Sequence, residues 1–191
     1  MTVIGKVLKA NTQSYVFGTR VPKQDVPIFG SLVRAKIQYR NATVYGLIYN
    51  IEVLDDGMTK MMSVFDDLKR EDIEWQRNRR VPVEASVLCV GFREDGGPVR
   101  HALSAQPPIT LDEVFVCDKD DVCAFTQKLD FFRLIVEARD APCDELLAAT
   151  IRYASNCHPN HDVFLQQCGR ELARLLAADG ARLDGLLRRL L

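Results

Sequence analysis

The sequence lacks the phosphate-binding loop of a nucleotide-driven motor. That loop, GxxxxGK followed by Ser or Thr, needs glycines for close approach to the phosphates and a lysine to contact them. The sole Gly-Lys pair is Gly5-Lys6, and Val7 follows it. No apolar run reaches the roughly 18 residues of a membrane-spanning helix, and the first ten residues have no signal-peptide pattern. We therefore expect a cytoplasmic protein that does not enter a membrane and has no motor of its own.

The chain also has little net charge, since 25 Lys+Arg and 26 Asp+Glu give a formal charge of −1. It therefore has no overall attraction to nucleic acid or to a membrane surface. A secreted disulfide scaffold is shorter and denser in cysteine than these 191 residues. We expect reduced and mostly buried thiols at Cys89, Cys117, Cys123, Cys143, Cys157 and Cys168.

Residues 1–110 have the pattern of a small β-barrel. Turn-forming residues such as Asn11-Thr12 and Gly96-Gly97 separate short runs rich in β-branched and aromatic residues. Strands this closely spaced favour a closed barrel of five or six strands, which leaves no exposed edge. The expected strands are residues 2–9, 14–20, 31–39, 43–53, 83–92 and 99–103, with a long insertion at 56–80.

The rigid pair Pro107-Pro108 is taken as the boundary of a second, helical domain at residues 111–191. Within it we expect a short extended segment at residues 111–117 and then a change to helical periodicity. We expect a first helix capped by Asp118 or Asp120 and running to about residue 139, and a second opened by Pro142. A third at about 162–178 is expected to end at Gly180 as a left-handed cap. The leucines that follow, at residues 183–191, are expected to pack either onto the bundle core or in an interface between two copies. The predicted fold class is α+β, a closed barrel of about six strands followed by a bundle of three to four helices.

Four segments of the barrel half carry a resemblance to a known family. They are Ile4-Gly5-Lys6-Val7, Tyr15-Val16-Phe17, Gly30-Ser31-Leu32-Val33 and Val44-Tyr45-Gly46-Leu47-Ile48. Their order resembles the HAS-barrel family, the N-terminal barrel shared by HerA-type DNA-translocating ATPases and ATP synthase subunits. The resemblance covers about residues 1–110, and the ATPase core that follows in HerA-type proteins is absent here. Another small barrel is the alternative.

The resemblance implies a six-stranded barrel that packs in rings and offers a docking surface for a partner nuclease. It carries over no catalytic residue and no cofactor. We therefore expect a non-enzymatic assembly or adaptor module that docks on a HerA-like ATPase, on a nuclease or on its own copies.

A basic cluster in the insertion offers a second hypothesis. Basic side chains neutralise phosphates while a base stacks on an indole, so the alternative function is a barrel that binds nucleic acid. Interspersed Asp and Glu residues cancel this charge, so a protein interface or a solvated surface fits equally well. The candidate binding residues are Lys69, Arg70, Trp75, Arg77, Arg79 and Arg80.

Cys157, His158 and His161 are weak candidates for a zinc site, with Cys168 further along the chain. Adjacent residues such as Cys157 and His158 rarely chelate one tetrahedral ion. The pair also lacks the orienting third group of a Cys-His nucleophile. We favour a loop whose residues cap the third helix, with no metal.

Overall fold

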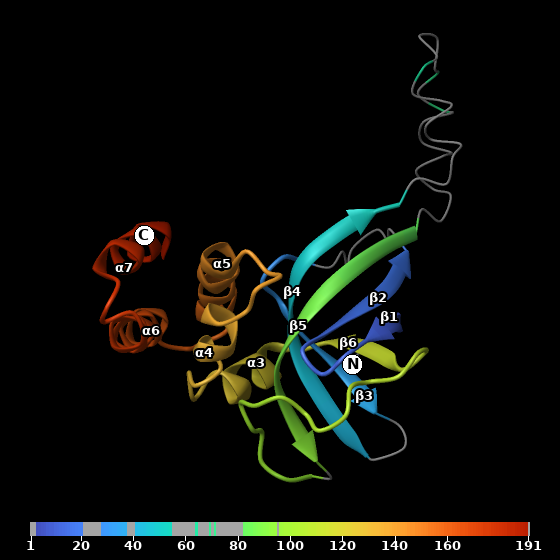
Figure 1. Ribbon diagram of the computed structural model, residues 1–191, viewed down its shortest axis with the longest axis horizontal. Helices are drawn as coiled ribbons and strands as arrows, with labels where there is room; N and C mark the ends of the chain where they lie inside the picture. The colour runs from blue at the N-terminus through green and yellow to red at the C-terminus, as the bar shows by residue number, and fades with distance from the viewer. Residues whose placement is uncertain are drawn as a thin grey trace.

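The structure, a computed structural model, describes residues 3–20, 28–37, 41–54, 64, 69, 71, 82–94 and 96–190. Within these ranges six antiparallel strands close into a barrel and five helices follow (Figure 1). The predicted α+β class, with a closed barrel before a helical bundle, is confirmed.

The barrel closes because its last strand pairs with both its first and its third. The strands run around the barrel in the order β1-β2-β5-β4-β3-β6. Alternate side chains fill the interior, among them Val7, Phe17, Val44 and Val87, all at most 1% exposed. The strands are β1 (Val3–Ala10), β2 (Ser14–Arg20), β3 (Leu32–Ile37), β4 (Ala42–Val53), β5 (Pro82–Glu94) and β6 (Glu113–Val116).

Two expectations for the end of the barrel are wrong. The segment 99–103 is not a strand, since only Arg100 pairs there, through two bonds of 2.9 Å with Phe92. The next residue, His101, turns out of the ladder and packs its ring 4.6 Å from that of Phe125. The sixth strand is instead β6, within the extended segment expected at residues 111–117 beyond Pro107-Pro108, so the barrel ends at Val116.

The helices are α3 (Lys119–Phe125), α4 (Phe132–Val136), α5 (Cys143–Ser155), α6 (His161–Leu175) and α7 (Gly180–Leu190). The Asp118 carboxylate accepts from the Asp121 N–H, so Asp118 caps α3, and Pro142 precedes α5; both were predicted. The predicted first helix is two helices, because the Thr126 hydroxyl donates to the Val122 carbonyl and ends α3.

Gly180 does not end a helix in the left-handed region. It is the first residue of α7, where the Asp179 carboxylate accepts from the Arg182 N–H at 3.1 Å and caps the helix. The C-terminal leucines contribute to the core. Leu186 is fully buried, and Leu183 and Leu190 are partly buried and pack against the core that the helices share with the barrel.

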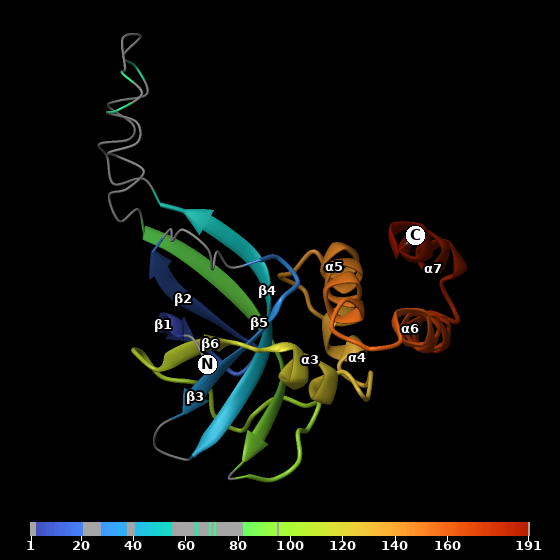
Figure 2. The same ribbon diagram turned by 180° about the vertical axis from the view of Figure 1, so that it is seen from behind.

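The helices cover one wall of the barrel. Figures 1 and 2 show α3, α4 and α5 next to the barrel, with α6 and α7 beyond them. The outer side chains of β3, β4 and β5 share a second core with the helices, separate from the barrel interior. The ring centroids of Tyr45 on β4 and Phe125 on α3 are 5.2 Å apart, and those of Phe125 and Phe131 are 5.1 Å apart. Barrel and helices are therefore joined by a shared aromatic core.

Candidate docking surface of the barrel

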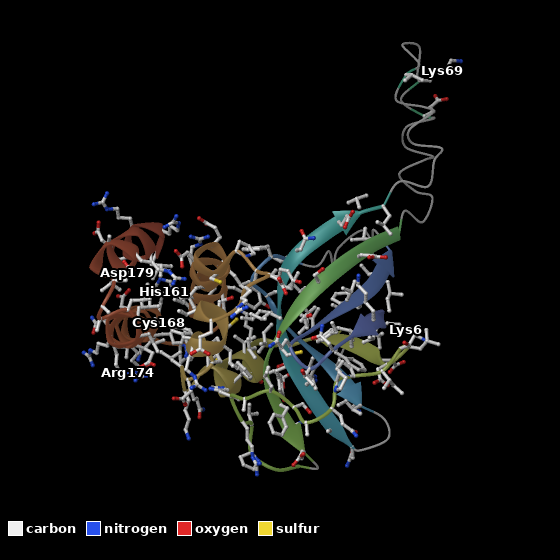
Figure 3. All side chains as sticks on the ribbon, viewed as in Figure 1. Lys6, Lys69, His161, Cys168, Arg174 and Asp179 are labelled. Atoms are coloured by element: carbon white, nitrogen blue, oxygen red, sulfur yellow. The ribbon has the colours of Figure 1, made fainter. Side chains whose placement is uncertain are left out.

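The wall formed by β1 and the start of β6 lies on the side of the barrel away from α6 and α7. Figure 3 labels Lys6 of β1 on that side, opposite Cys168 and Arg174 of α6. Of the helices that the structure describes, α4 packs against β5 and α5 packs against β4. The wall formed by β1 and β6 is therefore open to a partner on this side.

Strand pairing places apolar and charged side chains together on the outside of this wall. Val3 of β1 stands opposite Phe115 of β6, and Lys6 stands opposite Glu113. Directly opposite residues share one face of a sheet. Val3 is 45% exposed and Lys6 is also exposed, so this face points outward. The wall has an apolar pair at one end and an oppositely charged pair beside it.

A bulge in β1 adds Leu8 to the same surface. Val7 pairs with Phe17 and Lys9 with Val16, so Leu8 is the extra residue between two paired neighbours. Its side chain is 43% exposed and lies against Gly18 of β2, where the lack of a side chain leaves room for it. Val7 points into the barrel while Leu8 and Lys9 are both exposed, so the bulge places two consecutive side chains on the outside.

A turn at residues 109–112 holds a second exposed leucine beside the first. The Leu111 N–H donates to the Val7 carbonyl at 2.8 Å, and the Val7 N–H donates to the Asp112 carbonyl at 2.9 Å. The buried Asp112 carboxylate closes the turn by accepting from the Ile109 N–H at 2.8 Å. We name the surface formed by Val3, Lys6, Leu8, Leu111, Glu113 and Phe115 the β1–β6 wall.

Leu111 occupies the left-handed region, with φ of 72°. This conformation costs an L-residue about 1–2 kcal/mol. The side chain is 63% exposed, so burial within the monomer repays little of that strain. Strained residues cluster at functional sites, and an exposed strained leucine suits a binding surface.

The predicted basic cluster contributes one described residue. Lys69 is exposed, and Figure 3 places it well away from the barrel and the helices. The other candidates, Arg70, Trp75, Arg77, Arg79 and Arg80, lie outside the described residues, so their joint role in binding stays a prediction.

The side chains of the three weak metal candidates, Cys157, His158 and His161, have different surroundings. His158 stacks on Phe164, with 4.0 Å between ring centroids, and its Nε2 lies 2.7 Å from the Thr126 hydroxyl. The Cys157 thiol contacts the Tyr153 carbonyl at 3.6 Å, and His161 begins α6 on the surface. Burial lowers the pKa of His158. Across the described ranges no three His, Cys, Asp or Glu side chains are placed to hold a metal ion.

A cavity of about 270 Å³ lies between the barrel and the segment after α4. Its apolar lining includes Tyr49, Leu88 and Leu134, and Glu137 and Arg139 lie at its charged rim. Sites for drug-sized ligands are usually larger, about 300–1,000 Å³. Cys89 also borders the cavity, but burial raises the pKa of its thiol to about 12, which keeps it protonated and poorly nucleophilic.

The features of the β1–β6 wall were missed by the sequence analysis. The sequence predicted a strand at residues 2–9, but nothing in the local sequence marks a bulge at Leu8 or a left-handed Leu111. The pairing of Lys6 with Glu113 joins residues more than a hundred positions apart, so no local pattern could have found it.

Comparison with known proteins gives no match, either to a family model or to a curated relative. None of the helices within the described ranges has the length and apolar character needed to cross a membrane.

Proposed function

We propose that this chain is a non-enzymatic assembly module that docks through the β1–β6 wall. The observation that carries the proposal is the strained, exposed Leu111 beside Leu8, on the side of the barrel away from α6 and α7. Apolar side chains within a polar rim are typical of protein interfaces. The cavity between barrel and helices supports no competing enzymatic proposal, since it is small and its thiol is not activated.

The occupant we propose is a second copy of the chain. An isologous interface must be complementary to itself, because the same patch is used by both partners. Lys6 and Glu113 stand next to each other on this face. A two-fold axis that passes between them would bring Lys6 of each copy opposite Glu113 of the other. The apolar side chains on either side, Val3 and Phe115 at one end and Leu8 and Leu111 at the other, would then meet apolar surface.

The resemblance to the HAS-barrel family supports an assembly function. The closed six-stranded barrel agrees with the architecture that the resemblance implies. In HerA-like systems such a barrel packs with neighbours in a ring and receives a nuclease. A HerA-like ATPase or a nuclease is therefore the alternative occupant of the same wall.

Nucleic-acid binding is the second candidate function, and it depends on the insertion rather than on the β1–β6 wall. Lys6 and Lys9 are exposed on β1, but Glu113 stands directly opposite Lys6 and offsets its charge. An acidic side chain within a basic row weakens attraction to phosphates. This mixed charge favours a protein partner at the wall.

Light scattering on the pure chain over a wide range of concentration tests the proposal. A dimer or ring whose fraction rises with concentration supports self-assembly. A strict monomer that acquires a fixed stoichiometry with a purified HerA-like ATPase or nuclease moves the occupant to that partner. A strict monomer with neither partner contradicts the proposal, and a salt titration of binding to DNA then tests the second candidate.

A further inference from the structure

Two cysteines from different helical segments meet beside the barrel. Cys123 lies on α3 and Cys157 in the turn after α5, 34 residues along the chain. The Cys123 thiol donates to the Cys157 carbonyl at 3.0 Å. Both residues are half-buried, so small reagents can reach them from solvent. This contact between a thiol and a backbone carbonyl places the two cysteines next to each other, although they are far apart in the sequence.

The sulfur of Cys157 is close enough to respond to that of Cys123. The pKa of Cys157 is raised chiefly by burial and further by the negative charge that Cys123 carries as a thiolate. The Cys157 thiol now contacts the Tyr153 carbonyl at 3.6 Å. Cys157 lies beyond Ser155, the last residue of α5, and its sulfur moves between staggered positions by rotation about the Cα–Cβ bond. Disulfide formation requires the rotamer that turns this sulfur toward Cys123.

We propose that Cys123 and Cys157 form a modification site at which a peroxide generates a reversible disulfide. One thiolate attacks the peroxide, the O–O bond breaks, and a sulfenic acid and one water form. The second thiol then attacks the sulfenic sulfur, the S–O bond breaks, and a second water leaves as the S–S bond forms. Two thiols and one hydrogen peroxide thus give one disulfide and two waters. A dithiol reductant reverses the reaction.

The remaining cysteines are poorly placed for this chemistry. Cys89, Cys117 and Cys168 are buried, and burial raises the pKa of each thiol, to about 12 for Cys89 and Cys168. Cys143 is half-buried, but it begins α5, at the end of that helix opposite to Cys157. Its thiol donates to the Ala138 carbonyl at 3.0 Å. Cys143 is therefore a matched control of similar exposure.

The disulfide would tie the helix that faces the barrel to the turn between α5 and α6. Helix α3 carries Asp121, which pairs with Arg34 of β3, and Phe125, which packs on Tyr45 of β4. Closing a loop of this length restricts the unfolded chain and stabilises the fold. We expect oxidation to raise the Tm, and a reductant to return it to the starting value.

The experiment treats the full chain with hydrogen peroxide, counts free thiols and maps disulfides by peptide mass spectrometry. We expect the wild type and Cys143→Ser each to lose two thiols, in one intramolecular Cys123–Cys157 link that dithiothreitol removes. Cys123→Ser and Cys157→Ser should form no intramolecular disulfide.

The mapping of the wild type needs no variant, so it decides the question even if a serine variant fails to fold. A disulfide that involves any other cysteine, a link between two chains, or sulfinic acid at either position without a disulfide would overturn the proposal. This test is independent of the proposed assembly function.

Discussion

Arg34 of β3 and Asp121 of α3 form an ion pair across the junction between barrel and helices. Arg34 Nη1 lies 2.9 Å from Asp121 Oδ1, and the two side chains are 6% and 21% exposed. The second atoms of the pair, Arg34 Nη2 and Asp121 Oδ2, are buried and have no hydrogen-bond partner among the described residues. The guanidinium therefore depends on this carboxylate, and the helical unit is fixed to the barrel by a charge contact as well as by aromatic packing.

Breaking this ion pair should destabilise the fold. We expect Asp121→Asn to cost about 3 kcal/mol, because it leaves the Arg34 charge buried without a counter-charge. Urea unfolding measures the change. The control is Asp184→Asn, which breaks the exposed pair with Arg188 and should cost less than about 0.5 kcal/mol. Equal losses at the two sites would contradict the importance of the junction pair.

Gly30 allows α5 to approach the barrel closely. Its φ is 82°, and an added Cβ would lie 2.7 Å from the Cβ of Ala149. We expect Gly30→Ala to cost about 2–3 kcal/mol, from backbone strain together with the clash. Gly96 has a φ of 73° with no atom near the added Cβ, so Gly96→Ala should cost only about 1 kcal/mol. Thermal or urea unfolding of both variants separates the cost of the clash with Ala149 from the cost of backbone strain, which both variants share. Equal losses of stability in the two variants would show that α5 moves away to relieve the clash.

Much of this fold could be predicted because its signals are local. The first five strands, the Asp118 cap and the start of α5 at Pro142 each depend on a few neighbouring residues, and each was placed correctly, unlike the expected strand at 99–103. The break after Phe125 depends on the Thr126 hydroxyl, which bonds Val122 and contacts His158, 32 residues away. The start of α7 was missed because Gly180 was read as a helix end, although Asp179 before it is an equally good N-cap.

Acidification should destabilise the protein below about pH 6.5. The pKa values of His101 and His158 are lowered, in both cases chiefly by burial. Between the ordinary histidine pKa and the lower folded value, the unfolded chain binds more protons than the native chain. Stability is therefore full above this window and falls as the pH drops through it.

Urea unfolding from pH 7.5 to pH 5 measures this dependence. We expect His158→Gln to flatten the curve, because it removes one of the two histidines whose pKa burial lowers. A His158→Gln curve as steep as that of the wild type would contradict the assignment.

Leu111→Gly separates stability from assembly. Glycine relieves about 1–2 kcal/mol of left-handed strain and adds about 0.5–1 kcal/mol of backbone entropy to the unfolded chain. We therefore expect the isolated fold to be equally stable or up to about 1.5 kcal/mol more stable. Association should weaken, because an apolar side chain is lost from the β1–β6 wall. A large loss of monomer stability, seen by chemical unfolding at low concentration, would show that Leu111 serves the fold instead.

The candidate site was less predictable than the fold, for a physical reason. The predicted sites lay in charge-rich and cysteine-rich segments, because titratable groups can be recognised residue by residue. The β1–β6 wall depends on a bulge, a left-handed leucine and a pairing between distant strands, all of which arise only when the barrel closes.

The most direct test of the assembly proposal is light scattering on wild type, Leu8→Glu and Val163→Glu at matched concentrations. Leu8 on the β1–β6 wall is 43% exposed, and Val163 on α6 is 50% exposed, so both substitutions place a charge at a similarly open apolar site. We predict an assembled wild type and Val163→Glu, and a monomeric Leu8→Glu with an unchanged Tm at low concentration. Assembly of Leu8→Glu equal to that of the wild type would contradict docking through this wall.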